Sequence, residues 1–311
     1  MSATTRRAFL GRAGHSSLAA LLVPAVPRLL RAAPLGGPVG IQLYAVKDSL
    51  LASPAATLKA LRAIGYGEVE TAGFGERSAR QFRALLDDAG LACPSAHLNF
   101  EPDRLAAAFD DAHALGARYA ASGSLRAQVK RDLPAAAAAS AGMTLEEAKR
   151  TAELANRIGE QARRVGLQYA YHNHDFEFAD LGDGTIGYDL LLRETDPGLV
   201  KFEIDCGWMV LGGRDPRDYF ARHPHRFPMI HVKDFQPPPA QAPAGAAPAH
   251  PGAELGHGMI DYRPILAAAE KSGLKHYFAE QEGPFSRMSD LEAARQAYRY
   301  LSMMPALASN R

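Results

Sequence analysis

The sequence predicts an α/β protein, a closed (β/α)8 barrel of the TIM type, and three observations support this prediction. From Gly40 onward, short apolar stretches typical of buried strands alternate with stretches that have the spacing of amphipathic helices. Strands separated by helices form parallel sheets. The strand-like stretches end in polar side chains, as expected where the carboxyl ends of barrel strands meet at one mouth. An open, doubly wound sheet is the alternative, but no glycine-rich phosphate-binding turn follows the first strand.

The elements are expected in a regular order, with turn signals between them. Glycines end three of the predicted helices, at Gly65, Gly90 and Gly116, because glycine readily adopts the backbone conformation that follows a helix. Thr144 and Glu147 form a capping box at the start of the clearest helix. The strands are expected at residues 40–44, 68–70, 91–97, 117–121, 169–172, 201–205, 227–232 and 276–280. The helices are expected at residues 58–64, 78–89, 105–115, 144–165, 218–222, 262–271 and 291–301.

Composition sets the size and the charge of the domain. The chain has 311 residues, 47% of them hydrophobic, which is enough for one large core, and residues 36–311 are expected to form a single barrel domain. Within it, residues 236–256 are rich in proline and alanine and are expected to form a loop at the mouth, either a linker or a lid. The net charge of +1 provides no field that would attract nucleic acid or an anionic membrane. Cys93 and Cys206 match no metal spacing, and we expect Cys206 to be a packed thiol.

The first 35 residues resemble a twin-arginine signal peptide. Arg6 and Arg7 precede a short, weakly apolar segment, which is followed by small residues where a signal peptidase would cut. A disordered, arginine-rich tail is the alternative. Because Pro24 and Pro27 interrupt the apolar segment, a membrane-spanning helix of about 20 residues is not expected. The sequence therefore predicts export to the periplasm or the extracellular space, without stable membrane insertion.

Side chains that bind metals stand at the predicted carboxyl ends of four strands. Alternate residues of a strand face the same side, so His172, Asp205, His231 and Glu280 are all expected to point toward the barrel axis. Mixed nitrogen and oxygen donors suit one divalent ion such as manganese, cobalt, iron, zinc or magnesium. A buried network of ion pairs is the alternative interpretation. We favour the metal because so much buried charge needs a cation or a partner.

Seven short motifs carry a resemblance to a known family. They lie at residues 42–44 (QLY), 70–73 (ETAG), 95–97 (SAH), 171–178 (YHNHDFEF), 202–208 (FEIDCGW), 231–234 (HVKD) and 279–282 (AEQE). Together they resemble the xylose-isomerase-like TIM barrels of sugar phosphate isomerases and epimerases, from about residue 39 onward. In the ketose epimerases of that family, one ion is bound by Glu, Asp, His and Glu at the ends of strands five to eight. Asp205, His231 and Glu280 match three of these positions, whereas His172 stands where the epimerases have glutamate.

The histidine at strand five leaves two arrangements open. Either His172 binds the metal and His174 or Glu177 moves protons, or Glu177 loops back as the ligand. Relatives that resemble inosose dehydratases or process 3-keto-glycosides also carry histidine-rich ends at this strand. The resemblance thus implies a divalent-metal-dependent isomerase or epimerase that acts on a sugar or keto-sugar through a metal-stabilised enediolate. A lyase, dehydratase or 3-keto-glycoside-processing enzyme on the same site is the alternative.

Further residues take roles under this hypothesis. Glu280 is a candidate general base beside His174 and Glu177, since a base works best with a pKa near the working pH. Lys233 would stabilise developing negative charge, unless it forms an ion pair with a neighbouring carboxylate such as Asp234 or Glu203. The residues expected to contact the sugar are Gln42, Glu70, His97, Trp208 and Glu282.

Two functions of other classes compete with the enzymatic interpretation. A non-catalytic, secreted sugar-binding protein would use the same mouth without turnover. An endonuclease for damaged DNA on the same barrel would need a basic groove to meet phosphates, and the near-zero net charge argues against it. Since no basic phosphate clamp is evident and sugar phosphates are mostly cytoplasmic, an unphosphorylated sugar is the expected partner. A homo-oligomer is compatible with the sequence.

Overall fold

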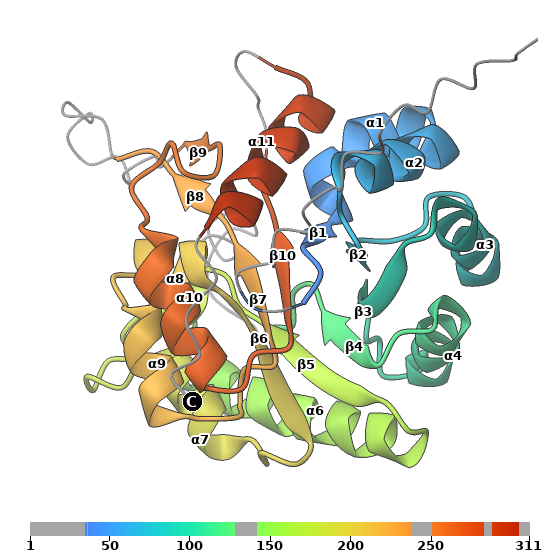
Figure 1. Cartoon of the computed structure of the whole chain (residues 1–311). Coiled ribbons are helices and arrows are strands. Elements are labelled where there is room, and N and C mark those ends of the chain that lie inside the picture. The colour runs from blue at the N-terminus through green and yellow to red at the C-terminus, as the bar shows by residue number, and fades with distance from the viewer. Residues whose placement is uncertain (1–34, 36, 128–141, 238–250, 283–287, 305–311) are drawn as a thin grey trace, which may run out of the picture. The chain divides into compact units, whose positions relative to one another are not determined.

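The predicted barrel is confirmed in the computed structural model, which describes residues 35, 37–127, 142–237, 251–282 and 288–304 (Figure 1). All of these residues belong to one compact unit that begins at Arg31. Eight parallel strands close on one another in the order β1-β10-β7-β6-β5-β4-β3-β2. These strands are β1 (Gly40–Gln42), β2 (Glu68–Thr71), β3 (Ala92–Leu98), β4 (Tyr119–Ser122), β5 (Gln168–His172), β6 (Val200–Asp205), β7 (Met229–Val232) and β10 (His276–Ala279).

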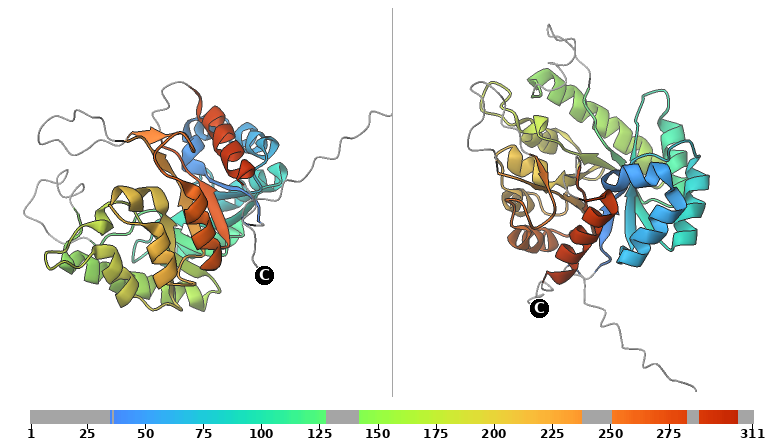
Figure 2. Two further views of the ribbon diagram at one scale, coloured as in Figure 1. Left: turned by 60° about the vertical axis from the view of Figure 1, so that its left-hand side comes forward. Right: turned by 90° about the horizontal axis from the view of Figure 1, so that it is seen from above.

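Helices surround the strands on the outside of the barrel (Figure 2). The described helices are α1 (Lys47–Ala52), α2 (Pro54–Ile64), α3 (Ala79–Ala89), α4 (Leu105–Leu115), α6 (Leu145–Arg164), α7 (Gly187–Glu194), α8 (Cys206–Leu211), α9 (Pro216–Arg222), α10 (Tyr262–Lys271) and α11 (Asp290–Met303). The capping box expected at Thr144 and Glu147 is present, and Gly65, Gly90 and Gly116 follow helices α2, α3 and α4 as predicted. No helix within the described ranges has the length and apolar character that crossing a membrane would require.

Several short elements were not expected from the sequence. The first strand ends at Gln42 rather than at residue 44, because the Gln42 side chain accepts a hydrogen bond from the Tyr44 backbone N–H and begins a 3-10 turn at Leu43–Val46. Helices α1, α7 and α8 were also not predicted from the sequence. A small antiparallel ribbon, β8 (Asp234–Phe235) with β9 (Gly252–Ala253), frames the loop insert. Residues 238–250 of that insert and the predicted signal segment at residues 1–34 lie outside the described residues.

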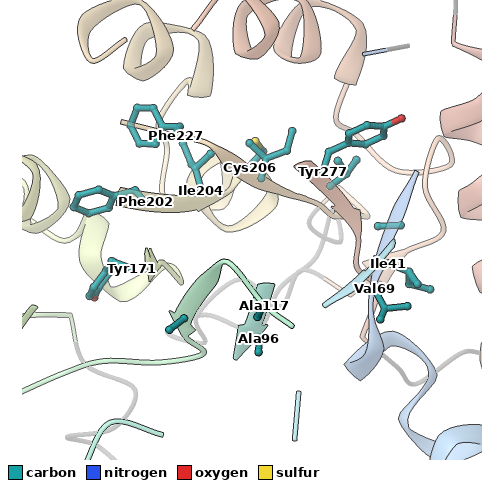
Figure 3. Packing of buried hydrophobic residues seen from close by; sticks show 14 of the residues in the cluster. Ile41, Val69, Ala96, Ala117, Tyr171, Phe202, Ile204, Cys206, Phe227 and Tyr277 are labelled. Atoms are coloured by element: carbon teal, nitrogen blue, oxygen red, sulfur yellow. The ribbon is translucent and has the colours of Figure 1, made fainter. Parts of the chain in front are cut away.

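The core has two parts because strand side chains alternate between the helices and the barrel axis. Outward residues such as Val69, Tyr171 and Ile204 pack beneath the helices (Figure 3). The inward residues near the amino ends of the strands form a small apolar plug of Tyr119, Ala121, Ala170, Met229 and Phe278. Phe278 fits there only because Gly40 stands beside it, where a Cβ atom would lie 2.5 Å from Phe278 Cδ1.

Above this plug the inward positions become polar. The inward residues on β2, β3, β6 and β7 include Glu70, His97, Glu203 and His231, and His231 lies two residues beyond Met229 of the plug, toward the carboxyl end of β7. Glu70, Glu203 and His231 are fully buried. The apolar plug thus forms a floor, and a layer of charged side chains lies between that floor and the mouth.

Candidate active site

A cavity of about 540 Å³ opens at the carboxyl ends of the strands. Its described walls come from most of the strand ends around the barrel. The lining residues are Gln42, Tyr44, Ala72, Gly73, His97, Leu98, Asn99, Gly123, Ser124, His172, His174, Trp208, Glu280 and Glu282. This cavity lies where residues of a (β/α)8 barrel carry out chemistry.

Three of the four predicted metal ligands meet at the base of this cavity. One ligand atom from each of Asp205, His231 and Glu280 lies within 4.8 Å of the others. They come from the ends of β6, β7 and β10, strands that are far apart in sequence but neighbours in the barrel. Asp205 and His231 are paired in register on adjacent strands, which explains why their side chains converge.

Asp205 is held in a fixed position by its neighbours. Its Oδ1 accepts the Trp208 backbone N–H at 2.8 Å and thereby caps helix α8. The buried side chain of Asn173 accepts the Asp205 backbone N–H at 3.0 Å and donates to the Asp205 carbonyl at 3.3 Å. The second carboxylate oxygen, Oδ2, is buried and has no hydrogen-bond partner in the described part of the chain. Burial is the main cause that raises the pKa of Asp205 to about 7, which Lys233 opposes.

His231 links this group to a carboxylate beneath it. Its Nδ1 lies 3.1 Å from Glu280 Oε2, and its Nε2 lies 2.7 Å from Glu70 Oε2. Glu70 in turn accepts the Gln42 amide at 2.8 Å and the Ser95 hydroxyl. A carboxylate on the far nitrogen is the arrangement that orients metal-binding histidines in proteins. Glu70, predicted to contact the sugar, therefore lies below the cavity wall and supports His231.

His172 lies with a second group instead of the first. Ligand atoms of His97, His172, Glu203 and His231 all lie within 4.8 Å of one another, and His172 Nδ1 is 3.7 Å from Glu203 Oε2. His97 Nε2 lies 2.8 Å from Glu203 Oε2 and 3.1 Å from Glu70 Oε2. The four predicted ligands thus converge, but they divide between two overlapping groups that share His231.

The histidines of this layer differ in charge. Burial opposes the charged form of His97, but Glu70 and Glu203 outweigh it and raise its pKa to about 10. Burial likewise opposes protonation of His231, and its carboxylate neighbours Glu203 and Glu280 nevertheless raise its pKa well above the usual range. Burial lowers the pKa of His172, and its positive neighbours lower it further, so His172 is neutral.

Lys233 forms ion pairs, although with partners other than those expected. Its ammonium lies 3.4 Å from Glu280 Oε2 and also contacts Glu282, rather than Asp234 or Glu203. Asp234 turns away and accepts backbone N–H groups from the loop at residues 256–260. The Lys233 ammonium also lies 4.7 Å from the centre of the Trp208 ring. Burial lowers the pKa of Lys233, but Glu280 and Asp205 outweigh this effect and raise it, so Lys233 remains charged beside the cavity.

Glu177 is removed from the cavity. Its Oε1 accepts the Tyr171 hydroxyl at 2.9 Å, and its Oε2 accepts the His174 backbone N–H at 2.9 Å. Burial raises its pKa to about 8, although both hydrogen bonds favour the charged form. Since its two oxygens face the chain that follows β5, Glu177 anchors this loop, and the structure places it neither among the ligand groups nor in the cavity wall.

His174 and Trp208 form one wall of the cavity. Their rings lie 6.1 Å apart, and both His174 Nδ1 and Trp208 Nε1 are buried without a hydrogen-bond partner in the described residues. Burial lowers the pKa of His174 to about 4. A neutral imidazole and an indole at the cavity wall are suited to accept a proton and to pack against the apolar face of a sugar ring.

The residues present fit a divalent metal. Asp205 Oδ2, Glu203 Oε1 and His172 Nδ1 are buried polar atoms without partners in the described residues, and such atoms are expensive unless something binds them. Two carboxylates and an imidazole from Asp205, Glu280 and His231 form a mixed oxygen and nitrogen donor set, which suits first-row divalent ions. Three protein ligands leave coordination positions free, as in catalytic rather than structural sites.

Sequence reasoning missed the supporting residues. Glu203, Ser95, Asn173 and Tyr262 hold the site together, and Tyr262 does so by a hydrogen bond with the Lys233 backbone. Their hydrogen-bond partners lie up to 106 residues away in the sequence, as for Glu203 and His97. Only the inward alternation of Glu203 with Asp205 gave a usable signal in the sequence.

Comparison with known proteins agrees with this fold. The family model described as "xylose isomerase-like TIM barrel" matches residues 58–302. Inosose dehydratase from Lacticaseibacillus casei is 32% identical over 146 residues, which cover 43% of this chain and 47% of that protein. The match thus spans about half the length of this curated relative.

Two solved structures have the same fold. A sugar phosphate isomerase/epimerase from Parabacteroides distasonis is 25% identical, with a TM-score of 0.69 over 87% of this chain and 96% of that one. A xylose isomerase-like TIM barrel protein from Mycobacterium smegmatis, solved in complex with magnesium, is 19% identical, with a TM-score of 0.60 over 87% and 98% of the two chains.

Proposed function

Because the chain belongs to the xylose isomerase-like TIM barrel family, a family of sugar-processing enzymes, we propose that it is a divalent-metal-dependent enzyme acting on a keto-sugar. The reaction begins with removal of the proton next to the carbonyl group, which gives an enediolate. The observation that carries this proposal is the convergence of Asp205, His231 and Glu280 beneath an open cavity. The buried Asp205 Oδ2, which has no hydrogen-bond partner in the described residues, offers a cation a ligand atom at the same place.

The side chains around the cavity have three separate roles in this reaction: metal binding, proton transfer and stabilisation of negative charge. A divalent ion held by Asp205, His231 and Glu280 would supply a Lewis acid that stabilises negative charge on the substrate oxygens. His174 lines the cavity as a neutral imidazole, and it accepts the proton from carbon. Lys233 provides a fixed positive charge next to Glu280, which favours the enediolate electrostatically.

Elimination of water is the outcome of the enediolate that we favour over epimerisation. Epimerisation by two bases needs a second carboxylate opposite Glu280, and this chain has His172 at that strand end. In elimination, the imidazolium of His174 returns its proton to the hydroxyl group on the next carbon, and that group leaves as water while the new double bond forms. The similarity to inosose dehydratase supports the same outcome. Isomerisation remains the second candidate because of the similarity to the isomerase/epimerase from P. distasonis.

The substrate that we propose is unphosphorylated and is met outside the cytoplasm. Lys233, beside the cavity, is already paired with Glu280 and Glu282, so it does not serve as a phosphate clamp. The proposal of export rests on the arginine pair at Arg6 and Arg7.

The test uses proton exchange, which precedes every fate of the enediolate. Purified protein is depleted of metal and reloaded with manganese, zinc, cobalt or magnesium. It is then incubated in heavy water with ketoses, inososes and 3-keto-glucosides. We expect metal-dependent deuterium incorporation next to the carbonyl and loss of water from at least one substrate. Asp205→Ala and His231→Ala should lose both bound metal and exchange, whereas the exposed control Asp88→Ala should retain them. Full metal occupancy in either site variant would refute the assignment.

A further inference from the structure

A second chamber adjoins the main cavity. It has a volume of about 250 Å³ and shares four wall residues with the cavity: Gly73, His97, Leu98 and Asn99. It extends from the ends of β2 and β3 to the first turns of α4. Because these four residues line both spaces, a ligand bound at the strand ends can extend into the chamber. The two volumes together fall within the range of about 300–1,000 Å³ that is typical of ligand-binding clefts.

The lining of this chamber is apolar on one side and polar at the rim. Phe74, Leu98 and Ala108 provide apolar surface, and Phe74 is braced by Phe82 with ring centres 6.2 Å apart. A half-exposed aromatic ring beside aliphatic surface suits the apolar face of a sugar or another ring. The polar rim includes Asn99, with an amide that can both donate and accept hydrogen bonds.

The charges at the rim indicate the kind of ring that fits. Glu101, Arg104 and Asp111 all line the chamber, and one positive charge against two negative charges does not favour a phosphate group. The Arg104 guanidinium forms no hydrogen bond to any described residue, so it is available to a hydroxyl oxygen. An uncharged ring that carries hydroxyl groups would meet both the apolar surface and the hydrogen-bonding rim.

We propose that the enzyme takes a two-ring substrate, a glycoside or disaccharide, with its reacting keto-sugar in the main cavity and a second, uncharged ring in this chamber. The proposal rests on the proposed function for the identity of the first ring, but the chamber itself is defined by its own residues. His97 stands at the junction, where Glu70 and Glu203 hold its Nε2. The linkage between the two rings would therefore pass over His97 and Asn99.

The first experiment measures binding and needs no turnover. The metal-loaded full chain is titrated by calorimetry with glucose, glucose 6-phosphate and a panel of glucose disaccharides, together with the 3-keto derivative of each sugar. We expect at least one disaccharide to bind about tenfold more tightly than its one-ring counterpart, and glucose 6-phosphate to gain nothing over glucose. Equal affinity for one-ring and two-ring ligands would overturn the proposal, as would preference for the phosphate.

Single-residue variants test whether the tighter binding of disaccharides arises in the chamber. Phe74→Ala and Arg104→Ala should each lower disaccharide affinity by about fivefold or more while leaving one-ring affinity unchanged. Arg80→Ala, on the exposed face of α3, serves as the matched control for loss of an arginine. Arg104 is exposed, so its removal should not unfold the chain, and thermal melts of all variants check this. An equal loss of affinity for one-ring and two-ring ligands would show that the effect of the substitution does not arise in the chamber.

Kinetics separate this inference from the proposed function. If the chamber variants turn over one-ring keto-sugars normally but lose kcat/KM on two-ring substrates, both proposals stand. If disaccharides bind preferentially but no keto-sugar reacts, the proposed function fails and the second subsite remains. If one-ring and two-ring keto-sugars react equally well in all variants, the function stands and the subsite is refuted.

Discussion

We expect the substitution Glu177→Gln to stabilise the protein increasingly as the pH rises, without removing bound metal. Glu177 is fully buried, and burial raises its pKa from an ordinary 4.5 to about 8. Glutamine can replace it with little rearrangement. Its amide oxygen can accept the His174 backbone N–H, and its amide nitrogen can donate to the Tyr171 hydroxyl, which still donates to the Leu125 carbonyl at 3.1 Å.

The magnitude follows from proton linkage. Between pH 4.5 and about pH 8 the folded protein holds a proton on Glu177 that the unfolded chain has released. Wild-type stability therefore falls as the pH rises through this window, whereas glutamine does not titrate. At about 1.4 kcal/mol per pKa unit, the full shift corresponds to about 5 kcal/mol. Between pH 5 and pH 8 the variant should gain about 3–4 kcal/mol in unfolding free energy relative to the wild type.

The assay is urea unfolding followed by circular dichroism at four pH values from 5 to 8, on metal-free protein. Glu146→Gln, which removes an exposed glutamate on α6, is the matched control and should show no such trend. Parallel stability curves for wild type and Glu177→Gln would refute the linkage argument. Loss of metal or of proton exchange in Glu177→Gln would instead restore Glu177 as the ligand or the base that the sequence allowed.

Three further predictions concern the metal, the loop after β7 and export. Asp205→Asn should weaken manganese binding by more than about 100-fold, whereas Glu203→Gln, which removes a partner of His231, should weaken it by at most about tenfold. The reverse order, measured by calorimetry, would place the ion among His97, His172, Glu203 and His231. Asp234→Asn should lower the unfolding free energy by about 2–3 kcal/mol in urea, because Asp234 Oδ2 accepts two backbone N–H groups that an amide nitrogen would repel; an unchanged midpoint would contradict this. Replacing Arg6 and Arg7 together by lysine should leave the precursor in the cytoplasmic fraction of a bacterial host, and normal export would rule out the twin-arginine route.

The regular part of the fold could be predicted because its signals are local. The helices at Leu105–Leu115 and Tyr262–Lys271 lie where their apolar spacing placed them. The short helix Cys206–Leu211 was missed because it continues an apolar strand without a break, and periodicity does not separate two short apolar elements. The helix Gly187–Glu194 has no side-chain cap at Ile186 and carries three consecutive leucines, so it offered neither a start signal nor a helical period.

The candidate site was predictable at the level of strand ends and no further. Alternation along strands located Asp205 and His231, and the barrel brought them together with Glu280. Which carboxylate supports which histidine depends on rotamers and on pairs distant in sequence, such as His231 with Glu70. The same limit explains Glu177: its spacing from His172 allowed a ligand, but a short 3-10 turn directs its side chain toward Tyr171.

The charge of the buried layer gives an independent argument for a cation. Four carboxyl groups and three basic side chains meet there among the described residues: Glu70, Glu203, Asp205, Glu280, His97, His231 and Lys233. When every one of these groups is ionised, the layer has a net charge of −1. The imbalance falls on Asp205, because burial raises its pKa and its Oδ2 has no hydrogen-bond partner among the described residues. Binding a divalent ion at Asp205 would restore neutrality if His231 released a proton, since histidine binds metals only as the neutral imidazole. The buried charges that would destabilise a metal-free barrel are therefore the ones that a metal ion would stabilise.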